Sequence, residues 1–151
     1  PDGRTVAEIA QANLADIGIE AEIVSYDWGT YLDRTDSGEH QMALLGWTGD
    51  NGDPDNFLYV LLSTEAAKVP AGNIAFWRND EFDALIEEAK TTFDRDRRTE
   101  LYMEAQEVFH DQVPWVPVAH SVVTVPVRDH VRDFVIYPTG KRVFYDVWLD
   151  N

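Results

Sequence analysis

A tryptophan and an aspartate three residues apart, Trp47 and Asp50, could together hold a ligand that carries a positive charge. An indole ring offers a large rigid surface, and a carboxylate forms a charge-assisted hydrogen bond with an ammonium group. Both lie in the sequence GWTGDNGDPDNF (residues 46–57), which we call the signature segment. The apolar run before it, residues 42–45, is typical of a buried strand. Ligand sites of α/β proteins commonly lie at strand ends, so the pattern predicts a binding site here.

The other acids of the signature segment have structural interpretations. Asp53 precedes Pro54, a residue suited to the first turn of a helix, so Asp53 is expected to cap that helix. Asp55 would be a first-turn acid facing the helix dipole. Asp50 could instead stabilise a turn or cap a helix, because Asp followed by Asn-Gly is common in turns. A hydrolase using Asp50 with Asp53 or Asp55 is an alternative, but no nucleophile or base motif supports it.

The elements before the signature segment alternate between helix and strand. Helical spacing covers residues 6–17, with Gly18 as a C-cap. Residues 19–24 alternate apolar and polar, which predicts a strand. A short helix over 26–34, capped by Asp27, precedes the strand at 42–45. This order predicts an α/β lobe with a parallel element in a mixed sheet flanked by helices.

The elements after the signature segment change character toward the C-terminus. A helix to about Leu62 and a loop over 63–79 precede two amphipathic helices, 80–92 and 96–112. The predicted inner faces are Phe82, Leu85, Ile86 and Ala89 in the first and Leu101, Tyr102, Ala105, Val108 and Phe109 in the second. Their acidic residues, which include Glu87, Glu88, Glu100, Glu104 and Glu107, are interpreted as a solvated outer face. The remainder is rich in valine and proline and predicts a β-rich tail.

Composition excludes several classes of function. The net charge is −16, from 28 acidic and 12 basic residues, so the acidic surface repels nucleic acid and anionic lipid. Such an excess favours a protein exposed to high salt, where screening offsets self-repulsion. The chain has no cysteine, and its four histidines lack metal-motif spacing. Residues 50–56 fail the EF-hand pattern, so neither a metal nor a cofactor is expected.

The signature segment resembles that of the bacterial solute-binding proteins that feed peptide ABC importers. The resemblance continues, in order, along the chain: residues 23–32 and 38–41 upstream, and 101–102, 105–106, 110–112, 119–121 and 138–141 downstream. Family members are considerably longer, so the chain resembles their C-terminal portion. The resemblance implies a two-lobed periplasmic binding protein (type II-like). Residues 1–122 would belong to ligand-binding lobe II, and 123–151 would form a tail returning to lobe I, with the crossing near 121–126.

The resemblance also implies roles for individual residues in binding a dipeptide between the two lobes. Asp50 would receive the α-ammonium group of the peptide. Trp47 and Trp28 would line side-chain pockets, with ordinary core packing as the alternative. Three further residues would leave backbone groups free to bond an extended peptide: Gly46, Thr48 and Gly49. In the family an arginine upstream of Pro1 binds the peptide carboxylate, and Arg4 does not match that position.

The resulting expectation is a binding protein, not an enzyme. It would deliver a dipeptide or short peptide to ABC permease subunits, and lobe I would be its missing partner. A relative that binds oligopeptides, haem or nickel is the alternative. The location would be periplasmic or otherwise extracytoplasmic, although no signal peptide is visible at the start of this chain.

Overall fold

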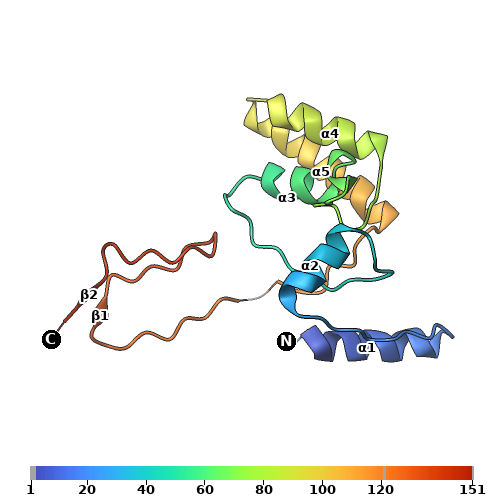
Figure 1. Ribbon diagram of the computed structural model, residues 1–151. Helices are drawn as coiled ribbons and strands as arrows, with labels where there is room; N and C mark the ends of the chain where they lie inside the picture. The colour runs from blue at the N-terminus through green and yellow to red at the C-terminus, as the bar shows by residue number, and fades with distance from the viewer. Residues whose placement is uncertain (1–2, 121, 151) are drawn as a thin grey trace.

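Three packed helices form the core of the computed structural model, which describes residues 3–120 and 122–150. They are α3 (Asp55–Leu62), α4 (Asp80–Thr91) and α5 (Arg95–Gln112). α4 and α5 lie side by side, and α3 packs against α4 (Figure 1). The side chains buried between them are Leu58, Leu61, Leu62, Phe82, Ile86, Ala89, Leu101, Tyr102 and Ala105. The two amphipathic helices and their inner faces are therefore confirmed.

Local hydrogen bonds fix where the two long helices begin. Asn79 precedes α4, and its side chain accepts a hydrogen bond from the backbone N–H of Phe82. Asp94 precedes α5 and accepts in the same way from the N–H of Arg97. Each cap satisfies a backbone donor that has no partner inside the helix.

The loop between α3 and α4 is held by one buried amide side chain, that of Asn73. Its Nδ2 lies 2.9–3.1 Å from the carbonyl oxygens of Leu62, Ser63 and Trp77. The loop contains the short helix η1 (Glu65–Ala67) and packs tightly on the core. The loop is therefore an ordered part of the core despite its length.

Two helices precede the signature segment, as predicted. α1 (Gly3–Asp16) starts three residues earlier than the helical spacing indicated, and Gly18 ends it at a φ of 83°. α2 (Trp28–Asp36) is capped by Asp27, which accepts from the N–H of Thr30. α1 buries none of its side chains within the described residues.

The predicted mixed sheet is not present in the part of the chain that the structure describes. Residues 19–24 and 43–45 have no assigned secondary structure, Met42 lies in a bend, and none of them joins a ladder. In residues 3–120 and 122–150 the only ladder is antiparallel, between β1 (Val131–Arg132) and β2 (Trp148–Leu149). Alternation describes which face of a strand would be buried, but a strand also needs a hydrogen-bonding neighbour. The described fold is therefore helix-rich with little sheet.

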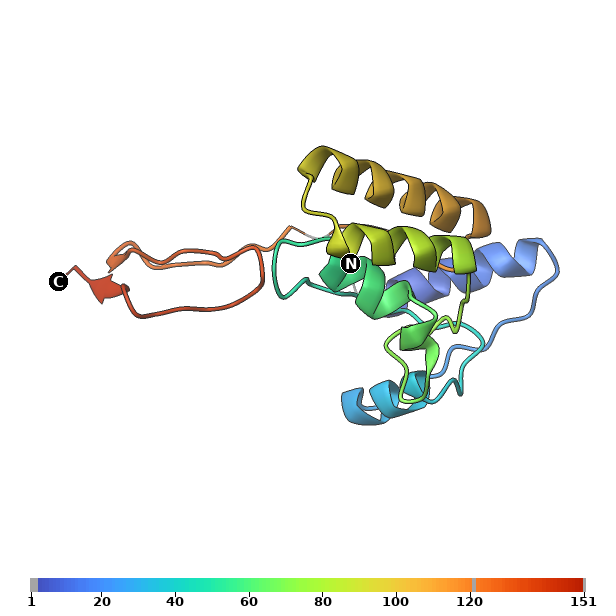
Figure 2. The ribbon, with the colours of Figure 1, turned by 90° about the horizontal axis from the view of Figure 1, so that it is seen from above.

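Residues 122–150 run away from the helices as two long arms (Figures 1 and 2). The prediction of a β-rich tail is not confirmed, because only β1 and β2 are strands. The arms meet the signature segment near their turn, where a Cβ on Gly140 would lie 3.6 Å from Cγ2 of Thr48. The predicted crossing at 121–126 includes Ser121, which lies outside the described residues.

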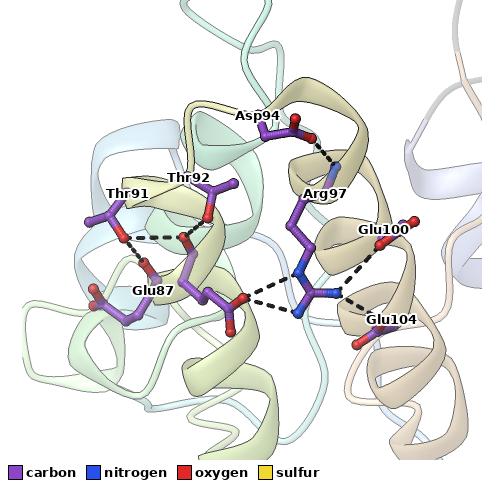
Figure 3. A network of polar contacts seen from close by, with 8 residues as sticks. Glu87, Thr91, Thr92, Asp94, Arg97, Glu100 and Glu104 are labelled. Carbon is purple, nitrogen blue, oxygen red and sulfur yellow. Dashed lines mark hydrogen bonds and ion pairs between the residues drawn. The ribbon is translucent and has the colours of Figure 1, made fainter.

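The outer faces of α4 and α5 are acidic and exposed, as predicted, and one arginine bridges them. Arg97 lies 3.0 Å from Glu88, 3.5 Å from Glu100 and 3.8 Å from Glu104. Figure 3 shows this network beside the start of α5. Exposed ion pairs contribute at most about 1 kcal/mol each, so the network is secondary to the core. None of the described helices combines the length and the apolar character needed to cross a membrane.

Candidate functional site

Tyr31 of α2 connects the two tryptophans of the predicted site. Its hydroxyl donates to the carbonyl of Leu44 at 3.0 Å and accepts from the N–H of Leu44 at 3.1 Å. Trp28 stacks on the Tyr31 ring with centroids 6.0 Å apart. α2 is thereby tied to the extended run that leads into Trp47. Trp28 is 66% exposed and Trp47 44% exposed, so in the described residues neither fills the core.

The signature segment is anchored to the helical core by a residue that sequence reasoning missed, Arg98 of α5. Its guanidinium binds both carboxylate oxygens of Asp53 at 2.8 Å. The same side chain donates to the carbonyl of Ala89 at 2.9 Å and to the Tyr102 hydroxyl at 2.8 Å. The hydrogen bonds from Arg98 hold the pKa of Asp53 below its usual range, and burial raises the pKa of Tyr102. One arginine therefore joins this segment, α4 and α5.

Asp55 occupies the position predicted for it, whereas Asp53 lies one residue before the N-cap position that was predicted for it. Oδ1 of Asp53 accepts from the N–H of Asp55 at 2.9 Å, which stabilises the start of α3. α3 begins at Asp55, so Pro54 rather than Asp53 stands at the N-cap position. Asp55 is a first-turn acid, where its charge faces the positive end of the helix dipole.

Asp50 differs from these two acids because no cation neutralises it in residues 3–120 and 122–150. Asp53 is bound by Arg98, whereas none of the ion pairs among the described residues includes Asp50. Asp50 is exposed to solvent. Its backbone N–H donates to Oδ1 of Asn56 at 2.8 Å, and Nδ2 of Asn56 lies 3.5 Å from its Oδ2. The carboxylate is therefore accessible and lies beside the amide of Asn56.

The remaining predicted site residues precede Asp50 in the same segment, where Gly46 and Thr48 are exposed and Gly49 is partly buried. A Cβ on Gly46 would meet open space, and Thr48 is exposed at the turn of the tail. Gly49 is more restricted, since a Cβ there would lie 3.2 Å from the backbone oxygen of Asn51. No group of three or more metal-binding side chains occurs among the described residues.

The Asp53–Arg98 pair predicts a specific pH dependence of stability. Because the pKa of Asp53 is lowered in the folded protein, the pair stabilises above the usual pKa of 3.8 and is lost as the pH falls through the folded value. Asp53→Asn should therefore reduce the urea midpoint at about pH 7 and much less at about pH 3. An equal reduction at both pH values would contradict an ionic role for Asp53.

An acid without an ion-pair partner among the described residues, beside exposed aromatic side chains, is an arrangement that can bind a cationic ligand. Residues 1–68 match the family model of the bacterial extracellular solute-binding proteins, family 5, middle part. The dipeptide-binding protein of Escherichia coli K12 is 47% identical over 150 residues, which are 99% of this chain and 28% of the relative.

Two further relatives extend the comparison. A periplasmic binding protein from Helicobacter pylori, solved with the peptide STSA, superposes with a TM-score of 0.89 and 43% identity. It is matched over 97% of this chain and 29% of its own. Heme-binding protein A of Haemophilus influenzae is 41% identical over 100% of this chain and 27% of the relative. The chain thus spans somewhat more than a quarter of the length of these relatives.

Proposed function

We propose that this chain is part of the substrate-binding component of a peptide ABC transporter and that Asp50 binds the α-ammonium group of a dipeptide. The observation that carries the proposal is the contrast between the acids of the signature segment. Asp53 is neutralised by Arg98, whereas Asp50 is exposed and has no cationic partner in the described residues. An ammonium group supplies the missing charge and up to three donors.

The surroundings of Asp50 suit a peptide. Trp47 and Trp28 offer exposed indole surfaces against which varied side chains can pack. The backbone at Gly46, Thr48 and Gly49 provides groups that can bond an extended peptide main chain. Such hydrogen bonds involve the main chain of the peptide and depend little on its side chains, which suits a transporter of many peptides.

The proposed architecture is a two-lobed protein with the peptide between its lobes. Residues 1–122 would belong to lobe II, and 123–151 would return to lobe I. Exposed apolar side chains on the segments that join no sheet support this division. Such side chains need another surface to cover them, and such segments need a neighbouring strand with which to form hydrogen bonds. They include Ile19, Ile23, Val24, Leu44, Leu45, Val122, Val123, Val135 and Val143. The location would be extracytoplasmic, with ABC permease subunits as the partners that receive the ligand.

Haem is the second candidate ligand, because a haem-binding protein is similar to the whole chain. The unpaired charge at Asp50 favours the peptide. Haem carries two propionate carboxylates, which a second carboxylate repels, whereas the amino end of a peptide is attracted to it.

Calorimetry of the full-length protein with di-, tri- and tetra-alanine and with N-acetyl-dialanine tests the proposal. Acetylation removes the positive charge, so it should weaken dialanine binding roughly 10- to 100-fold, in line with a hydrogen bond to a charged group. Equal affinity for the acetylated peptide would show that Asp50 does not bind the ammonium group. Tight binding of haemin with no binding of any peptide would favour the second candidate.

A further inference from the structure

The amide of Asn56 contacts Asp50 at two places, its backbone and its carboxylate. The backbone N–H of Asp50 donates to Oδ1 of Asn56 at 2.8 Å, and Nδ2 of Asn56 lies 3.5 Å from Oδ2 of Asp50. A backbone N–H can only donate, so the amide oxygen must face it. The amide nitrogen, which can only donate, is thereby turned toward the carboxylate. The two contacts place the amide of Asn56 beside both the backbone and the carboxylate of Asp50.

Asn56 is itself held rigidly, because it lies in the first turn of α3. Its backbone N–H donates to the carbonyl of Asp53, the acid that Arg98 anchors. Further along α3, Leu58, Leu61 and Leu62 are buried in the core. A side chain on such a support keeps its position better than one on a free loop.

Gly49 leaves the space that this arrangement needs. A Cβ at position 49 would lie 3.5 Å from Oδ1 of Asn56 and 3.2 Å from the backbone oxygen of Asn51. The second distance is tighter than most Cβ contacts, so a larger residue would require the turn that brings Asp50 to the amide to shift by a few tenths of an ångström. The absence of a side chain at Gly49 therefore allows the backbone of the turn to approach the side chain of Asn56.

We propose that Asn56 is a positioning residue, which holds the Asp50 carboxylate in the orientation that receives the ligand ammonium group. The inference rests on the proposed function and adds the residue that orients Asp50 toward the ammonium group of the peptide. An exposed aspartate samples several rotamers, and fixing one in advance lowers the entropy cost of binding. With Oδ2 beside the amide of Asn56, Oδ1 accepts no hydrogen bond among the described residues and is the oxygen that binds the ammonium group.

The test compares Asn56→Ala with Asn51→Ala in the full-length protein. Asn51 is a matched control, because its side chain also accepts one backbone N–H of the same segment, that of Asp53, at 2.9 Å. Affinities for dialanine and N-acetyl-dialanine are measured by calorimetry for each variant. Asn56→Ala should weaken dialanine binding roughly 5- to 10-fold and change binding of the acetylated peptide less than about twofold. Asn51→Ala should leave the ratio of the two affinities unchanged.

A double-mutant cycle with Asp50→Asn separates positioning from general damage to the loop. If Asn56 acts through Asp50, Asn56→Ala should have almost no further effect in the Asp50→Asn background. Equal losses for both peptides, or the same loss in both backgrounds, would overturn the inference while leaving the role of Asp50 intact. If Asp50→Asn alone had no effect, the proposed function itself would fail. Should Asn56→Ala not fold, Asn56→Ser removes the same amide and allows the same comparison.

Discussion

Asp50→Asn in the full-length protein is expected to bind dialanine roughly 10- to 100-fold more weakly than the unmodified protein. The change keeps the size and shape of the side chain but removes the charge that the ligand ammonium group needs. It also replaces one acceptor oxygen by a donor, which faces the ammonium protons unfavourably. Calorimetry at constant ionic strength measures the loss, because salt screens part of the attraction.

The matched control for this prediction is Asp55→Asn. It changes the net charge by the same amount, five residues away in the first turn of α3. Its effect on dialanine affinity should stay within about twofold, because a general change in surface potential is screened by salt. Similar losses in both variants would attribute the effect to overall charge and would count against a direct contact with Asp50.

Phe82→Ala should lower the free energy of unfolding by about 3–5 kcal/mol. Phe82 of α4 is fully buried in the core, and its ring contacts that of Trp77 edge-on, with centroids 4.9 Å apart. Truncation removes this contact and leaves a cavity that the surrounding helices fill only in part. Urea unfolding followed by circular dichroism measures the change.

Phe93→Ala provides the comparison of equal chemistry at an exposed position. Phe93 lies in the short loop that connects α4 to α5, and its side chain is fully exposed. Its truncation should therefore change the free energy of unfolding by less than about 0.5 kcal/mol. If both substitutions cost the same, the core of this protein would not be centred on Phe82.

The helices could be predicted because their information is local. The spacing of Phe82, Ile86 and Ala89 defines one face of α4 without reference to any other element. The cap at Asp27 likewise depends only on the three residues that follow it. Differences of one to three residues at helix ends are small beside these agreements.

The sheet could not be predicted reliably, because pairing is a property of two segments. The alternation in residues 19–24 indicates which side chains would face a core, and it says nothing about whether a neighbouring strand is present. The same limit explains the tail, whose valine-rich arms pair only at Val131–Arg132 and Trp148–Leu149. Sequence pattern defined the segments but not their partners.

The candidate site was predicted in part. The chemistry of the signature segment, and the resemblance that it carries, single out Asp50. The partner of Asp53 could not be found in this way, since Arg98 lies 45 residues further along the chain. Asn56 was also missed, because an asparagine in the first turn of a helix is common and gives no sign that its amide reaches back to Asp50.

The anchoring of the signature segment separates two kinds of residue, and this has a consequence for evolution. Arg98, Asp53 and Asn56 are linked to one another or to the core, so a substitution at any of them disturbs several contacts at once. Trp28 and Trp47 take part in none of these hydrogen bonds, and their side chains are 66% and 44% exposed. Substitutions at the two tryptophans are therefore expected to destabilise the fold less than substitutions at Arg98 or Asp53. If the two tryptophans line the side-chain pockets as proposed, descendants of one ancestral gene can acquire different ligand preferences there while keeping the acid at position 50.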